Sequence, residues 1–178
     1  EVFLVNNADA VASGNPIPHI APETFYQWFI WIGGSGATLG LVLAMVFFAR
    51  SKYLKALGKT CLVPGLFNIN EPIIFGAPIV LNPILIIPFI TVPLITATIS
   101  YVATTVGLVS PTYIMPPWTL PAPIGAYLAT GGDWRAIVMV LINIGISFAI
   151  YFPFLRMYDK KMLKMSRIKK ELYSLNIK

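Results

Sequence analysis

The stretch that decides the fold reads Asn68-Ile69-Asn70-Glu71-Pro72-Ile73-Ile74-Phe75-Gly76. Its Glu71 carboxylate is the one formal charge between Lys59 and Asp133. Burying an ionisable side chain in such apolar sequence costs roughly 2.5–3.5 kcal/mol on insertion scales, so an acid of this kind usually marks a substrate or ion pathway. Prolines at positions 72, 78, 83, 88 and 93 prevent one smooth helix there. A lone acid on broken backbone at membrane depth is typical of a transporter binding site.

The composition of the whole chain is that of a membrane protein. Hydrophobic residues make up 57% of it, the mean hydropathy is +0.75, and charged residues make up only 11%, against about a quarter in soluble domains. The charge-free runs 24–49 and 136–155 are each long enough for a spanning helix, which needs ~20 apolar residues. We therefore expect an all-α polytopic membrane protein, built from transmembrane helices and re-entrant helical hairpins.

The basic residues have a simple explanation in such a protein. They gather at 50–59 and 156–178 and give the chain a net charge of +6. Positive charge that flanks apolar spans marks the cytoplasmic side, and no nucleic-acid motif accompanies it, so we expect no nucleic-acid partner. One cysteine, Cys61, and one histidine, His19, do not make a structural zinc site. We expect no metal and no cofactor.

These patterns predict an order of segments along the chain. With both basic clusters cytoplasmic, the chain crosses the membrane an odd number of times between them, and the prolines favour one crossing plus a segment that dips in and returns. The expected order is a loop or the end of a re-entrant hairpin at 1–22, a span at 25–49, a basic cytoplasmic loop at 50–62, a re-entrant hairpin at 63–85, a span at 88–109, an outer loop at 110–132, a span at 136–155 and a helical, amphipathic cytoplasmic tail at 156–178.

The residues around Glu71 suit a polyhydroxylated solute. A carboxylate accepts hydrogen bonds from sugar hydroxyl groups, and the amides of Asn68 and Asn70 both donate and accept. A metal site would need several carboxylates or imidazoles. The alternative is a structural acid, neutralised by protonation or by nearby amides, but perturbed acids cluster at functional sites. We favour a substrate-binding role for these three residues.

Four further residues are candidate ligands of the same solute. The indole of Trp118 presents an apolar face on which a pyranose ring stacks, although aromatic residues are also common at interfaces. A lone histidine such as His19 is more often a surface or interface residue than a ligand. The glycine-rich run at 33–40 lacks the lysine and the glycine spacing of nucleotide-binding loops. Its small residues allow close helix packing, and they also allow backbone groups to face a ligand. We therefore include Ser35 and Gly36 in the candidate site.

Three stretches of the chain resemble one family. They are residues 67–78, which continue to Asn82 and Pro83, residues 29–39, which His19 precedes, and residues 117–125, which contain Trp118. Each is similar to the membrane-embedded IIC component of bacterial sugar phosphotransferase systems, in the branch for lactose, cellobiose and N,N′-diacetylchitobiose. The resemblance covers nearly all of the chain, and its glutamate motif is the most specific part.

The resemblance implies a function, partners and a location. It implies a homodimeric, multi-pass permease of the bacterial plasma membrane that lies among membrane lipid and takes up a β-linked disaccharide. Phosphorylation is carried by a separate cytoplasmic IIB component, so this subunit itself does no phosphoryl chemistry. The resemblance implies that residues 1–178 correspond to the C-terminal, substrate-binding part of the IIC transport domain. It also implies that the dimer interface lies in an N-terminal half, which this chain does not contain. In that family a histidine and the glutamate of the Asn-Glu-Pro motif hydrogen-bond the sugar, roles that fall here on His19 and Glu71.

Two other functions remain open from the residues alone. In a secondary transporter, Glu71 would carry a coupling proton. In a membrane anchor or assembly subunit, Glu71 would only cap a broken helix. Dependence on a proton gradient or on a phosphoryl donor separates the first of these from a phosphotransferase permease.

Overall fold

The computed structural model describes residues 1–176, and every regular element within that range is helical. The expected all-α class is therefore confirmed. In chain order the elements are α1 (Val2–Ala12), α2 (Glu23–Phe25), the π-helix η1 (Tyr26–Ile30), α3 (Leu39–Phe48), α4 (Lys52–Leu66), α5 (Glu71–Gly76), the 3₁₀ turn η2 (Ile79–Leu81), α6 (Ile86–Thr105), α7 (Ala122–Ala129) and α8 (Trp134–Asn176).

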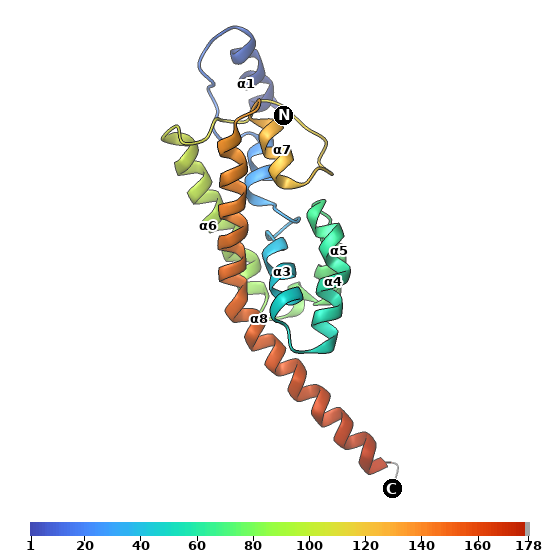
Figure 1. Ribbon diagram of the computed structural model, residues 1–178. Coiled ribbons are helices and arrows are strands. Elements are labelled where there is room, and N and C mark those ends of the chain that lie inside the picture. The colour runs from blue at the N-terminus through green and yellow to red at the C-terminus, as the bar shows by residue number, and fades with distance from the viewer. Residues whose placement is uncertain (177–178) are drawn as a thin grey trace.

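Two of these helices are long and apolar enough to cross a membrane. They are α6, with 20 residues, and the first 36 residues of α8; at 1.5 Å per residue, α6 alone measures about 30 Å, the thickness of the hydrocarbon layer. The two helices pack against each other and form the long axis of the molecule (Figure 1). Helix α8 does not end at the predicted boundary near 155 but continues without interruption to Asn176, so the predicted tail extends the same helix. Residues 177 and 178 of that predicted tail lie outside the described residues.

The segment expected to be one span at 25–49 is broken in its middle. Helix η1 ends at Ile30, and α3 begins only at Leu39. Between them the backbone has positive φ at Gly33, Gly34, Gly36 and Ala37. A right-handed helix does not continue through such left-handed conformations. The prediction of an uninterrupted span was wrong because hydropathy does not report the backbone angles of a glycine cluster.

A helical hairpin occupies the region around the glutamate motif. Helices α4 and α5 lie side by side (Figure 1), and residues 67–70, which we call the hairpin apex, connect them. The hairpin starts earlier than predicted, because most of the expected basic loop at 50–62 is helical. No proline interrupts residues 52–63, and lysine is a good helix former. Pro72 lies in the first turn of α5, where its missing N–H is tolerated.

Two segments expected to be irregular also contain helices. Helix α1 forms within the predicted loop at 1–22, and α7 forms within the predicted outer loop at 110–132. Prolines argued against a helix in the second segment, but Pro121 and Pro123 lie at the very start of α7, where proline is compatible with a helix. Helix α1 is held by Asn7, whose side-chain amide donates to the backbone oxygens of His19 and Thr112 at 2.8 and 2.9 Å.

The two basic clusters lie at the same end of the molecule. The Asp159 carboxylate accepts hydrogen bonds from the backbone N–H groups of Arg50 and Ser51 at 2.9 and 2.8 Å, which joins the start of α4 to the basic part of α8. At the other end of α8, the Asp133 carboxylate accepts from the N–H of Ser110 at 2.9 Å. The basic clusters therefore lie along one end of α8, and the 107–110 and 131–135 segments lie at its other end.

This arrangement predicts the sidedness of the chain. In a cysteine-free background of the complete protein, Lys55→Cys and Lys160→Cys should react with an impermeant maleimide from the cytoplasmic side, and Leu108→Cys from outside, because positive charge is retained on the cytoplasmic side. All three side chains are exposed, and Leu108→Cys leaves the Asp133 contacts intact. Labelling of Lys55→Cys and Leu108→Cys from the same face would contradict this topology.

Asp133 makes the end of the molecule opposite to the basic clusters sensitive to acid. Burial alone would raise the pKa of its carboxyl, but hydrogen bonds from Arg135 and Ser110 outweigh that effect and lower the pKa to about 2. Because the pKa in the folded state is depressed, the stabilisation is present above the ordinary pKa of about 3.9 and is lost as the pH falls towards 2. We expect Asp133→Asn to lower the melting temperature by a few degrees at pH 7, as for a lost helix cap, and by less at pH 3. Asp9→Asn, which alters an exposed acid on α1, is the control; equal losses at both pH values would refute the assignment.

Candidate functional site

The break between η1 and α3 forms a compact loop of residues 33–38, which we call the glycine loop. Its two ends are joined by the Thr38 hydroxyl, which donates to the Gly33 carbonyl at 2.6 Å. Gly34 has φ +90°, and a Cβ atom there would lie 2.4 Å from Cγ of Asn70. Only glycine combines this conformation with so close an approach. The glycine loop is thereby packed directly against the hairpin apex.

Asn68 ties three segments together. Its backbone adopts φ +61°, a conformation that asparagine tolerates better than most residues. The side-chain oxygen accepts from the N–H of Gly33 at 3.0 Å, and the amide nitrogen donates to the carbonyls of Leu120 and Trp118 at 3.0 and 3.3 Å. The hairpin apex, the glycine loop and the segment before α7 therefore meet at one amide.

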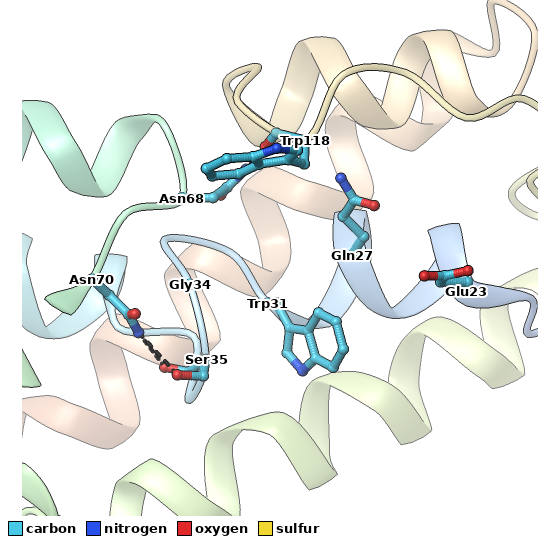
Figure 2. Close-up of a pocket in the computed structure, with 8 residues that line it drawn as sticks. All are labelled: Glu23, Gln27, Trp31, Gly34, Ser35, Asn68, Asn70 and Trp118. Carbon is cyan, nitrogen blue, oxygen red and sulfur yellow. Dashed lines mark hydrogen bonds between the residues drawn. The ribbon is translucent and has the colours of Figure 1, made fainter.

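Asn70 contacts the glycine loop from the same apex. Its amide nitrogen donates to the Ser35 carbonyl at 2.7 Å and lies 3.2 and 3.3 Å from the hydroxyl oxygens of Ser35 and Thr38. Within the described residues its Oδ1 accepts no hydrogen bond, and Figure 2 shows this oxygen turned away from Ser35. The residue is only 7% exposed, and the hydrogen bonds of the amide nitrogen fix the direction of this oxygen, which is therefore a positioned acceptor on the cavity wall.

A cavity of about 370 Å³ opens beside these residues. Eight residues line it: Glu23, Gln27, Trp31, Gly34, Ser35, Asn68, Asn70 and Trp118. Figure 2 shows the two indole rings on opposite sides of the space, with the Asn70 and Ser35 wall on one flank and Gln27 and Glu23 on the other. Aromatic faces combined with amide, hydroxyl and carboxylate groups provide stacking surfaces as well as hydrogen-bond donors and acceptors. This chemistry fits a ligand that has apolar ring faces and many hydroxyl groups.

The structure brings together four of the seven residues that the sequence suggested, namely Ser35, Asn68, Asn70 and Trp118. Gly36 lies one residue beyond the wall, where a Cβ would meet the Phe89 ring at 2.3 Å. Glu71 follows Asn70 directly as the exposed first residue of α5 but does not line the cavity.

His19 is placed away from the cavity. Its backbone N–H donates to Oδ1 of Asn7 at 3.0 Å, its Nε2 lies 3.3 Å from the side-chain nitrogen of Asn6, and its ring lies 4.3 Å from the Phe3 ring. These contacts hold the imidazole against α1. The sugar-binding role suggested for His19 stays a prediction for the assembled protein.

Four lining residues were missed by sequence reasoning: Glu23, Gln27, Trp31 and Gly34. Three of them, Glu23, Gln27 and Trp31, follow one another at intervals of four, which places them on one helical face. Gln27, a strongly polar side chain in an otherwise apolar run, was the available signal. The run was instead interpreted only as part of the span at 25–49. The neighbouring Trp28 is fully buried and fills the space beside Gly125.

Comparison with known proteins assigns the chain to a family. The family model "Phosphotransferase system, EIIC" matches residues 1–93. The chain belongs to this EIIC family. It is 51% identical to the lichenan permease IIC component of Bacillus subtilis (strain 168) over 159 residues, which are 89% of this chain and 35% of that protein. It is also 51% identical to the cellobiose-specific EIIC component of Geobacillus stearothermophilus, over 89% of this chain and 36% of that protein.

A solved EIIC transporter shares the fold. The crystal structure of ChbC, the IIC component from the N,N′-diacetylchitobiose-specific phosphotransferase system, superimposes with a TM-score of 0.90 at 41% identity, covering 93% of this chain and 39% of that chain. This EIIC chain thus spans about a third of the length of the curated relatives that it matches. The expected family and helical transporter fold are confirmed.

Proposed function

We propose that this EIIC chain is the sugar-binding part of a permease that takes up a β-linked disaccharide for phosphorylation by a cytoplasmic IIB partner. The observation that carries the proposal is the cavity, in which the unpaired acceptor of Asn70 and two tryptophan rings surround about 370 Å³ of space. Membership of the EIIC family supports the phosphotransferase mechanism over a proton-coupled carrier or an assembly subunit. The relatives named for lichenan, cellobiose and diacetylchitobiose support a β-linked substrate.

Each lining group has a role in this proposal. The Asn70 Oδ1 and the Ser35 hydroxyl take hydrogen bonds from sugar hydroxyl groups, while Trp118 and Trp31 stack on the apolar faces of the rings. Gln27 and Glu23 face the rest of the solute. Asn68 acts by holding the wall, because its amide already makes hydrogen bonds to three backbone groups.

Glu71, His19 and Gly36 remain part of the proposed site. Glu71 directly follows the wall residue Asn70, and its exposed side chain is free to reorient toward a ligand. These three assignments apply to the complete permease. We propose that this permease is a homodimer whose interface lies outside this chain, and that it lies among lipid as a multi-pass protein of a bacterial plasma membrane.

A reconstituted system tests the function. The complete permease in proteoliposomes should bind cellobiose or diacetylchitobiose and accumulate it as the phosphate ester only when IIB and a phosphoryl donor are supplied. Uptake should survive a protonophore. Uptake that follows the proton gradient and ignores the donor would instead establish a secondary transporter, and neither binding nor uptake of any β-linked disaccharide would favour the assembly subunit.

A further inference from the structure

Helix α8 carries three buried polar side chains at intervals of four: Asn143, Ser147 and Tyr151. Each donates a hydrogen bond to a backbone carbonyl of the broken segment. Asn143 donates to Phe29 at 2.8 Å, Ser147 to Ala37 at 2.6 Å and Tyr151 to Gly36 at 2.8 Å. Residues four apart lie on one helical face about 6 Å from each other along the axis. We call these three side chains the α8 ladder.

The broken helix creates the need for these donors. Where η1 stops and the glycine loop begins, the last carbonyls have no partner in their own helix. At membrane depth an unpaired carbonyl costs several kcal/mol, because no bulk water is present to replace the missing bond. Helix α3, which follows the loop directly, also fits α8 closely, since a Cβ on Gly40 would lie 2.3 Å from the Ser147 hydroxyl oxygen.

The glycine loop is consequently held from two sides. Asn70 holds the Ser35 carbonyl from the hairpin apex, and the α8 ladder holds the next two carbonyls, Gly36 and Ala37, from the opposite side. Ser35 and Gly34, the loop residues that line the cavity, immediately precede the two residues that α8 fixes.

We propose that Asn143, Ser147 and Tyr151 are positioning residues of the ligand site, which set the geometry of the cavity wall through the backbone of the glycine loop. This inference rests on the proposed sugar-binding function of the cavity. The α8 residues do not line the cavity themselves, so any effect on a ligand passes through the loop. A purely structural contribution of these hydrogen bonds would lower stability and leave the loop and the ligand affinity unchanged.

Tyr151→Phe tests the proposal because it removes a hydroxyl and keeps the ring. The matched control is Thr104→Val, which removes a buried hydroxyl that bonds a carbonyl of its own helix α6, that of Ser100 at 2.9 Å. In the complete permease we expect Tyr151→Phe to raise the dissociation constant for a disaccharide about fivefold, the usual effect of one hydrogen bond. Thr104→Val should change it less than twofold. Ser147→Ala is the second variant if Tyr151→Phe does not fold.

A second readout needs no sugar. With Cys61 replaced by alanine, Ser35→Cys reports the mobility of the glycine loop through its rate of reaction with a maleimide. We expect this rate to rise severalfold in the Tyr151→Phe background and to stay constant in the Thr104→Val background. Equal melting-temperature losses in the two backgrounds, with unchanged labelling and affinity, would overturn the positioning role. If the wild-type protein binds no disaccharide but the Tyr151→Phe substitution still accelerates labelling, the sugar site is refuted and the contacts between α8 and the glycine loop stand.

Discussion

Replacing Asn70 with leucine should weaken disaccharide binding about a hundredfold in the complete permease. Leucine has a similar size but does not donate to the Ser35 carbonyl, and it removes the acceptor that faces the cavity. Losing hydrogen bonds to the ligand and to the loop costs about 0.5–1.5 kcal/mol each, and a carbonyl left unpaired adds about 1–3 kcal/mol. Together these losses amount to about 2–6 kcal/mol, and about 2.7 kcal/mol, in the lower part of that range, corresponds to two decades in the dissociation constant.

Asn82 supplies the matched control for this experiment. It is a buried asparagine that follows η2, its Oδ1 accepts from the N–H of Ile84 at 3.0 Å, and it does not line the cavity. Asn82→Leu should lower the melting temperature and leave the dissociation constant within about twofold, because sites that share no partner act independently of each other. Calorimetric titration of both variants with the disaccharide measures the two dissociation constants. Similar losses of affinity in both variants would show that Asn70 acts only through the stability of the hairpin.

Replacing Glu71 with glutamine should weaken binding by about one to two decades. The substitution keeps the size of the side chain and removes its charge, and a hydrogen bond to a charged group contributes about 1.5–3 kcal/mol. Glu71 carries the one formal charge between Lys59 and Asp133, and it follows the wall residue Asn70 without a gap.

Glu23→Gln is the informative comparison, since Glu23 is the acid that lines the cavity. Its side chain is half exposed, so screening by solvent limits the energy of its contacts, and we expect at most about a threefold loss of affinity. Normal binding by Glu71→Gln together with a large loss in Glu23→Gln would transfer the role of sugar-binding acid from Glu71 to Glu23.

The long helices could be predicted because length and apolar character are enough to specify them. Helix α6 lies within the span predicted at 88–109 except for its first two residues, and α8 contains the span predicted at 136–155. The break at 31–38 could not be predicted in the same way. Its small residues were interpreted as allowing close helix packing and letting the backbone face a ligand. The positive φ values and the bonds from α8 to the Gly36 and Ala37 carbonyls, which define the conformation of the break, have no signal in the sequence.

The candidate site was predictable in part for a similar reason. Asn68, Asn70 and Trp118 stand out as polar or aromatic residues in or near unusual motifs, and the structure places all three at the cavity. Gln27 and Trp31 were hidden in a stretch that looks like a lipid-facing helix. His19 was assigned through a resemblance, and its position depends on Asn7 and Phe3, which are contacts that no local pattern reveals.

The bonds made by Asn68 also constrain the order in which the chain is able to fold. Its partners are separated from it by 35 residues on one side and by 50 and 52 residues on the other. Contacts of such long range form late, because loop closure must precede them. The Gly33 N–H precedes the hairpin of α4 and α5, whereas the two carbonyls to which the Asn68 nitrogen donates follow it. During synthesis this nitrogen therefore gains its partners, and the cavity closes, only after residue 120 has emerged from the ribosome. A chain that stops before that point retains the glutamate motif but lacks Trp118 and the two carbonyls to which Asn68 donates.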